Sequence, residues 1–294
     1  MKESIIPHFD SISPSAKSLL LTKALTTIPF AKEAAGLIFG EERIKNSREN
    51  LSSIGFLLRL NHFETRYLSI DKALTEIGIK NILEFSSGFS FRGLHLSKDP
   101  NISYIDTDLP QLIEDKKIIV EELSKRFCDY PTKNLLMLSL NVLEEDSFTR
   151  VINRFPVETV VIVNEGLLIY LDEEQKRKLC AIIHNLLSER GGYWITADIY
   201  IKKKNENSVT KDFFEEKGKK FLTNHNVEEN KFESFKDAES FFKDCGFDIY
   251  KKIEIPSSEE SSIKFLKNIP ESILRDIKKI KKTRETWILK PIDS

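Results

Sequence analysis

A run of apolar residues that ends in an acid is the segment of this chain most suggestive of chemistry. Val160–Val163 is followed directly by Asn164, Glu165 and Gly166. Branched apolar runs of this kind are typical of strands buried on both faces of a parallel sheet. Because an acid buried without a partner is costly, we expect Glu165 to face a ligand at the sheet edge where open α/β sheets bind their ligands. Pairing with a structural base is the alternative.

A glycine and an acid follow two earlier apolar runs. Gly88 comes after Ile82–Phe85, and Asp108 lies 20 residues later, at the end of the next run. Glycine lets the backbone approach a ligand closely, and an acid at about this separation accepts hydrogen bonds from ribose hydroxyls in doubly wound folds. Asp106 shares the segment, and a solvated strand end is the alternative for either acid.

Four blocks of the sequence stand in the order found in a known family. They are Ser86-Ser87-Gly88, Asp106-Thr107-Asp108-Leu109-Pro110, Asn141-Val142 and Glu165-Gly166-Leu167-Leu168-Ile169-Tyr170-Leu171. Together they resemble the leucine carboxyl methyltransferase family, class I S-adenosylmethionine (SAM)-dependent O-methyltransferases that include polyketide-type enzymes. The resemblance implies that SAM is the cofactor and that a methyl group is transferred to a carboxylate or a hydroxyl.

The same resemblance implies roles for individual residues. Asn141-Val142 would contact the adenine, where an amide oxygen can accept a hydrogen bond from the exocyclic amine, and Glu165 would lie beside the methionine part of the cofactor. Arg66 would bind the cofactor carboxylate through its guanidinium fork, and Lys17 aligns with a second cation of the family. The predicted cofactor-binding residues are therefore Lys17, Arg66, Gly88, Asp108, Asn141, Val142 and Glu165.

The sequence departs from the family pattern in the first block. Ser86 stands where a glycine is expected and Ser90 where an aspartate is expected, whereas Arg92 keeps the arginine. These departures leave open a non-catalytic binding or regulatory protein of the same fold. A nicotinamide-dependent oxidoreductase is a further alternative, although the chain lacks the G-x-G-x-x-G turn that binds a pyrophosphate. No general base is identified, so the catalytic residues stay unassigned; a base is needed only if the acceptor is a hydroxyl.

Seven short apolar runs separated by helix-length segments position these residues. Such alternation predicts an α/β fold with a doubly wound, mostly parallel, Rossmann-like sheet of the methyltransferase type. Pro110 suits a first helical turn, and Asp172 with Gln175 fits a capping box. The runs are 82–85, 102–105, 135–138, 160–163, 193–197, 247–253 and 287–289.

Two segments fall outside this alternation. Apolar residues at helical spacing over 13–77 predict a helical cap, and the stretch 199–235, rich in Lys, Asn and Glu but containing Phe213, Phe214 and Phe221, predicts a lid. The basic run from Arg275 to Arg284 predicts the solvated face of a C-terminal helix. We expect one domain, with a cap (1–77), a cofactor-binding core (78–198), a lid (199–235) and a C-terminal part of the sheet (236–294).

Charge and composition favour a small methyl acceptor, or a protein carboxylate, over nucleic acid or membrane. The 45 Lys and Arg residues nearly balance the 46 Asp and Glu residues, so no strong field attracts polyanions. We expect a cytoplasmic protein, because no apolar stretch is long enough to act as a signal or to span a bilayer. Three separated cysteines and five histidines without ligand spacing predict reduced thiols and no metal.

Overall fold

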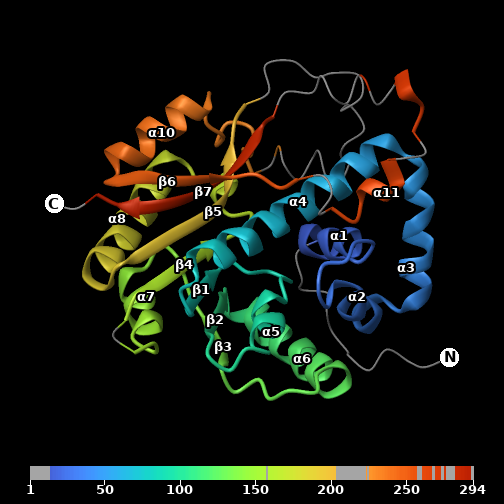
Figure 1. Cartoon of the computed structure of the whole chain (residues 1–294), viewed down its shortest axis with the longest axis horizontal. Helices are drawn as coiled ribbons and strands as arrows, with labels where there is room; N and C mark the ends of the chain where they lie inside the picture. Colours follow the sequence, from blue (N-terminus) through green and yellow to red (C-terminus); the bar gives the residue numbers. More distant parts are fainter. Residues whose placement is uncertain are drawn as a thin grey trace.

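A seven-stranded sheet forms the centre of the protein (Figure 1). The computed structural model describes residues 14–156, 158–202, 223, 225–256, 260–266, 269–272, 275 and 282–292. Every one of the seven apolar runs predicted from the sequence forms a strand. The strands are β1 (Asn81–Phe85), β2 (Ser103–Asp108), β3 (Leu135–Ser139), β4 (Val160–Asn164), β5 (Gly192–Tyr200), β6 (Phe247–Ile253) and β7 (Arg284–Pro291).

The order of the strands fixes where a ligand should bind. It is β3-β2-β1-β4-β5-β7-β6, in which β1 to β5 pair in parallel and β7 is antiparallel to both of its neighbours. The chain moves outward from β1 to β3 and then returns to place β4 on the other side of β1. In doubly wound sheets the ligand crevice lies at this reversal, beyond the carboxyl ends of the strands.

Helices cover both faces of the sheet (Figure 1). One face packs against α4, α5 and α6, with α1 and α2 beyond them, and the other packs against α7, α8 and α10. The predicted doubly wound α/β class is therefore confirmed. The helices are α1 (Pro14–Lys23), α2 (Ala31–Phe39), α3 (Glu41–Ser47), α4 (Ile54–Ile77), α5 (Arg92–Leu96), α6 (Pro110–Phe127), α7 (Glu145–Ile152), α8 (Glu173–Arg190), α10 (Phe235–Asp244) and α11 (Ile263–Leu266), with 3₁₀ turns at Arg48–Ser52 and Leu168–Tyr170.

Strand β4 shows why its sequence is uniformly apolar. Val161 and Val163 belong to the core on the α4 face, whereas Val160 and Ile162 belong to the core on the α8 face. Successive side chains of a strand point to opposite faces, so a strand with a core on both sides needs apolar residues at every position. The apolar run ends at Asn164, whose buried amide accepts from Trp194 Nε1 at 2.8 Å and donates to Asp198 Oδ2 at 2.7 Å.

Two predicted helix starts are observed. Pro110 is at the first turn of α6, where its missing N–H is not needed. Asp172 caps α8 by accepting from the Gln175 backbone N–H at 2.8 Å, and the Gln175 side chain accepts from the Asp172 N–H at 3.1 Å. This reciprocal capping box ends the loop that follows β4 and fixes the start of the helix behind it.

The segments expected outside the alternation differ from the sequence prediction in two places. Arg284 was expected on a basic helix, but it is the first residue of β7, because Trp287–Leu289 continues a strand that begins earlier than its apolar part. Strand β5 runs on to Tyr200, so the predicted lid range begins within the sheet. Phe213, Phe214 and Phe221 lie outside the described residues, and the lid remains a prediction. None of the helices that the structure describes is long and apolar enough to cross a membrane.

Candidate functional site at the carboxyl edge of the sheet

The loop after β1 has the backbone of a ligand-binding turn. Gly88 has φ +51° and Ser86 has φ +50°, in the left-handed region that costs a residue with a Cβ about 1–2 kcal/mol. The serine that replaces the first family glycine therefore keeps a conformation that glycine adopts freely. Strain of this kind is retained where surrounding structure or function requires it, and here it lies at the strand reversal.

Asp108 and Gly88, the two residues predicted to contact a nucleotide, lie together. Asp108 Oδ2 accepts from the Gly88 backbone N–H at 2.8 Å, and Asp108 Oδ1 accepts from the Leu109 N–H, also at 2.8 Å. The side chain is partly exposed. Partial burial raises the pKa of Asp108, although the two backbone hydrogen bonds oppose this shift. A carboxylate offers about four acceptor positions, so this one keeps capacity for further donors.

Asp106, two residues earlier, is in a different environment. It is 1% exposed, and its carboxylate pairs with Lys116 of α6 at 2.6 Å. Lys116 also donates to Ser87 Oγ at 2.9 Å, so the pair anchors the middle of the loop after β1. The geometry makes Asp106 a structural residue, and Asp108 is the acid of the two that a ligand can reach.

A second buried pair supports the same loop from the other side. Arg92 of α5 is 1% exposed; it forms a close ion pair with Glu84 of β1 and another with Asp71 of α4 at 2.6 Å. Ser90, which replaces the expected aspartate, donates to Glu84 Oε2 at 3.3 Å. An acid at residue 90 would place a second negative charge beside Glu84. A neutral serine is therefore compatible with the ion pair between Glu84 and Arg92.

Glu165 is surrounded by cations. Its side chain is 4% exposed and lies 2.7 Å from Lys23 Nζ, 3.0 Å from Arg66 Nη2 and 3.4 Å from Arg92 Nη2. Burial alone would raise the pKa of Glu165, but the three positive charges outweigh burial and hold it well below its usual value. The sequence offered two interpretations, a ligand contact and a paired acid, and the described residues form the paired acid.

Arg66 connects Glu165 with the end of β5. Its Nε donates to Glu165 Oε1 at 3.0 Å, and its Nη1 donates to the Tyr200 hydroxyl at 3.3 Å. Gly166 has φ +86°, and a Cβ added there would lie 3.4 Å from the Arg66 guanidinium nitrogens. The Glu-Gly pair at the end of β4 therefore serves two needs, a left-handed turn and close approach of an arginine.

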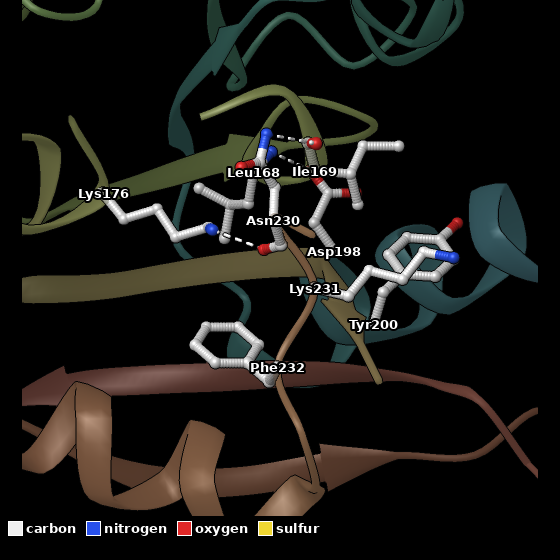
Figure 2. A pocket seen from close by; sticks show the side chains of 8 residues that line it. All are labelled: Leu168, Ile169, Lys176, Asp198, Tyr200, Asn230, Lys231 and Phe232. Atoms are coloured by element: carbon white, nitrogen blue, oxygen red, sulfur yellow. Dashed lines mark hydrogen bonds between the residues drawn. The ribbon is translucent and has the colours of Figure 1, made fainter. Parts of the chain in front are cut away.

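The turn after β4 is held by Asp198 of β5. The Asp198 carboxylate accepts from the backbone N–H groups of Gly166 at 2.6 Å, Leu167 at 2.6 Å and Leu168 at 3.1 Å. Figure 2 shows the outer side of this turn, where Lys176 donates to the Asn230 carbonyl at 2.5 Å and Asn230 donates to the Ile169 carbonyl at 3.2 Å. The crevice between these residues is too narrow for a water molecule, so this side of the turn is packed.

The two remaining predicted contacts, Asn141 and Val142, differ in exposure. Asn141, two residues after β3, is exposed; its Nδ2 donates to Glu144 Oε1 at 2.8 Å, and its Oδ1 accepts from the Leu143 N–H at 3.2 Å. Val142 is buried against the core on the α8 face. Because β2 pairs with β3 through Asp108 and Ser139, this turn lies at the same sheet edge as Asp108.

Lys17, a predicted cofactor contact, and Lys23, which contacts Glu165, lie in the same helix and differ in burial. Both residues belong to α1, but Lys17 is partly exposed and forms no hydrogen bond or ion pair with the described residues. Lys23 is 4% exposed and bonds Glu165. Burial lowers the pKa of Lys23, whereas the charge of Glu165 opposes this shift.

Comparisons with known proteins give only distant similarity. No protein-family model matches the sequence, and no curated protein matches it. Among solved structures, the methyltransferase domain of bacterial CtHen1 has 14% identity and a TM-score of 0.49, with 78% of this chain and 100% of that chain covered. The mitomycin 7-O-methyltransferase MmcR has 10% identity and a TM-score of 0.46, with coverage of 89% and 60%. The structure of LepI in complex with SAM has 11% identity and a TM-score of 0.45, with 76% of this chain and 46% of that chain covered.

The chain thus spans less than half the length of the LepI structure.

Several residues of the site were not predicted from the sequence. Glu84 and Asp198 each interrupt an apolar strand with an acid, the same signal that identified Glu165, and could have been found by it. Lys23 gave no such signal, because a cation near the end of a helix is common at protein surfaces. Its burial depends on the packing of α1 against the rest of the protein.

Proposed function

We propose that this protein is a SAM-dependent methyltransferase, a member of the leucine carboxyl methyltransferase family, that methylates an oxygen of its acceptor. The observation that carries the proposal is the pairing of Gly88 with a partly exposed Asp108 at the strand reversal. This is where a doubly wound sheet binds a nucleotide. The four sequence blocks that resemble the family all end at this edge.

The ribose end of SAM fits the residues present. Asp108 uses one acceptor position on each oxygen for a backbone N–H, which leaves others for two adjacent hydroxyls. The backbone hydrogen bond from Gly88 orients the carboxylate. Asn141 and Val142 would contact the adenine at the neighbouring turn, the former through its amide and the latter as part of the apolar floor.

The methionine end fits in a different way from the sequence prediction. Arg66 can offer a guanidinium to the cofactor carboxylate, and Glu165 can offer a carboxylate to the ammonium, but in the structure these two side chains bind each other. Arg66 would hold the cofactor carboxylate and Glu165 its ammonium, and both roles would require the ion pair between these two side chains to open. Lys23 and Arg92 would keep Glu165 ionised in that arrangement.

When bound, SAM would supply a methyl group that its sulfonium already activates, so the protein has to orient the acceptor and exclude water. No side chain is assigned as a general base, and a carboxylate acceptor would need none. The acceptor would be a small molecule or a protein carboxylate. The predicted cap and lid would enclose it, which would explain why residues far apart in sequence, such as Lys23 and Glu165, meet at this edge.

Titration calorimetry with SAM, its demethylated product S-adenosylhomocysteine and NAD tests the proposal. We expect the first two to bind and to stabilise the fold by about 2.7 kcal/mol at a hundredfold excess over the dissociation constant. Binding of NAD alone would contradict it and favour an oxidoreductase. Binding of the product without methyl transfer from labelled SAM to any carboxylate or hydroxyl of an acceptor panel would favour the non-catalytic alternative.

A further inference from the structure

A cavity of about 250 Å³ opens beside the proposed cofactor site. It lies between α4, the end of β6 and the start of β7. Because β7 is antiparallel to β5 and Arg284 pairs with Tyr200, the first residue of β7 is at the same carboxyl edge as Glu165. The cavity is lined by Thr65, Ser69, Ile253, Glu254, Ile255, Lys282, Arg284, Glu285 and Thr286.

Arg284 forms no ion pair with a carboxylate in the part of the chain that the structure describes. Its Nη1 donates to the Ala197 carbonyl at 3.3 Å and to Thr286 Oγ1 at 2.8 Å, and both acceptors are uncharged. Its Nε and Nη2 bond no described residue. Burial lowers the pKa of Arg284 and the charge of Arg66 adds to this shift, whereas Tyr200, Asp198 and Glu165 oppose it. A partly buried guanidinium with spare donors is stabilised by an anion.

The two acids at this cavity are already matched with other groups. Glu285 accepts from Trp287 Nε1 at 2.6 Å and lies 3.4 Å from Lys282 Nζ. Glu254 is 83% exposed along its side chain and pairs with the same lysine at 3.5 Å. Neither carboxylate lies within ion-pair distance of Arg284, so an incoming anion would meet a guanidinium that no carboxylate of this cavity contacts.

A chain of hydroxyl groups connects Arg284 with Arg66. Arg284 donates to Thr286 Oγ1, which is 2.6 Å from Ser69 Oγ, and Ser69 donates to the Arg66 carbonyl at 2.8 Å. Because the Ser69 hydroxyl already donates its proton to the Arg66 carbonyl, the Thr286 hydroxyl is the donor in its hydrogen bond with Ser69. These hydrogen bonds hold one edge of the Arg284 guanidinium and connect the cavity to the turn of α4 that carries Arg66.

We propose that this cavity is a subsite for a carboxylate of the methyl acceptor, with Arg284 as the anchoring cation and Ile253 and Ile255 against the apolar body. Its identification with the acceptor rests on the proposed methyltransferase function, whereas carboxylate binding itself does not. The volume lies below the range of about 300–1,000 Å³ for sites that enclose whole ligands. It therefore suits one end of an acceptor whose reacting oxygen lies nearer Glu165.

Ligand-observed NMR with pairs of carboxylates and amides tests the subsite. Benzoate against benzamide represents a small-molecule acceptor, and N-acetyl-leucine against its amide represents a protein terminus. We expect at least one carboxylate to bind more tightly than its amide, and Arg284→Gln to weaken that binding about tenfold or more, as loss of a charged hydrogen bond should. The preferred pair identifies the source of the carboxylate.

Lys282→Gln is the matched control, because it removes a cation from the same cavity that is already paired with two acids. We expect Lys282→Gln to change the affinity for the carboxylate by less than twofold. Equal binding of carboxylates and amides, or equal loss in both variants, would overturn the subsite. If Arg284→Gln does not fold, phenylglyoxal labelling of the wild type replaces it: benzoate should slow modification of Arg284 relative to the exposed Arg177, and no protection would overturn the proposal.

Calorimetry with S-adenosylhomocysteine on the same samples separates the two proposals. Arg284→Gln should keep the affinity of the wild type for this ligand. Carboxylate binding that depends on Arg284 without any binding of S-adenosylhomocysteine would leave the anion site standing and contradict the methyltransferase function. The reverse result would contradict the subsite alone.

Discussion

Strand β2 ends in a carboxylate and β4 is followed directly by one, both at the same edge of the sheet, but the two acids are held in opposite ways. Asp108 accepts hydrogen bonds from two backbone N–H groups and is partly exposed. Glu165 is 4% exposed and meets three cations. The first keeps acceptor capacity for a ligand, whereas the second must exchange a partner before it can bind one. The comparison shows that the groups around a strand-end acid decide its role.

The contrast extends to the pKa values of the two acids. Burial raises the pKa of Asp108, whereas the charges of Lys23, Arg66 and Arg92 lower that of Glu165 despite its burial. We therefore expect substitutions at Glu165 to act first on the fold and substitutions at Asp108 to act first on the ligand.

Glu165→Gln should have the largest effect on stability. Removing the acid leaves Lys23, Arg66 and Arg92 buried together without it, and breaking a buried pair from one side costs about 3–5 kcal/mol. Urea denaturation of the ligand-free protein should show this loss. An unchanged unfolding midpoint would favour the ligand contact predicted for Glu165 over the structural ion pair.

The same variant gives a pH test. Because the pKa of Glu165 is lower in the folded than in the unfolded protein, its stabilisation is complete above the usual value of 4.5 and is lost as the pH falls below it. The difference in unfolding free energy between wild type and Glu165→Gln should therefore shrink from pH 5 towards pH 3. A constant difference would mean that the charge of Glu165 is not what stabilises the fold.

Asp108→Asn should weaken SAM binding by about 1–3 kcal/mol, because it removes the charge from hydrogen bonds to the ribose. Calorimetry measures this loss. Asp99→Ala is a control, since Asp99 also accepts a backbone N–H, at 2.9 Å from Asn101, but is placed outside the site. Asp106→Asn should instead destabilise the protein through Lys116. Equal loss of affinity from Asp106 and Asp108 with unchanged stability would contradict the division of roles.

Ser86→Gly should raise stability by about 0.5–1 kcal/mol. The substitution removes the strain of a left-handed serine, about 1–2 kcal/mol. The greater conformational freedom of glycine in the unfolded chain offsets part of this gain. Thermal unfolding provides the measurement. Ser87→Gly is the matched comparison, because it lacks a positive φ and loses the Lys116 contact; it should destabilise. If both variants are destabilised alike, the backbone at residue 86 is not strained.

Lys17→Ala should have the smallest effect, within about 0.5 kcal/mol for both stability and SAM affinity, as is usual for exposed positions. Lys23→Ala should destabilise the protein, since it removes a partner of Glu165. A clear loss of SAM affinity in Lys17→Ala, measured by calorimetry, would show that the ligand-bound protein uses the residue that the sequence suggested.

The strands and their order along the chain could be read from the sequence because both faces of the sheet are buried. Burial on two faces requires continuous apolar runs, and β4 with Val160–Val163 is the clearest case. Such patterns depend on a few neighbouring residues, so they can be recognised without knowledge of the tertiary contacts. The hydrogen bond between Gly88 and Asp108 was not predicted, although both residues were expected to contact the nucleotide.

The electrostatic partners of the site depended on the tertiary structure. Lys23 and Glu165 are separated by 142 residues and touch at 2.7 Å, and nothing local in either segment encodes that contact. Arg284 was expected in a helix and lies in a strand, because the pairing of β7 with β5 outweighs a basic local pattern. By itself the sequence determined which strands carry acids to the edge, since apolar periodicity is a local property. Only the fold decided which of those acids meets cations and which stays open, because charge pairing depends on distance in space.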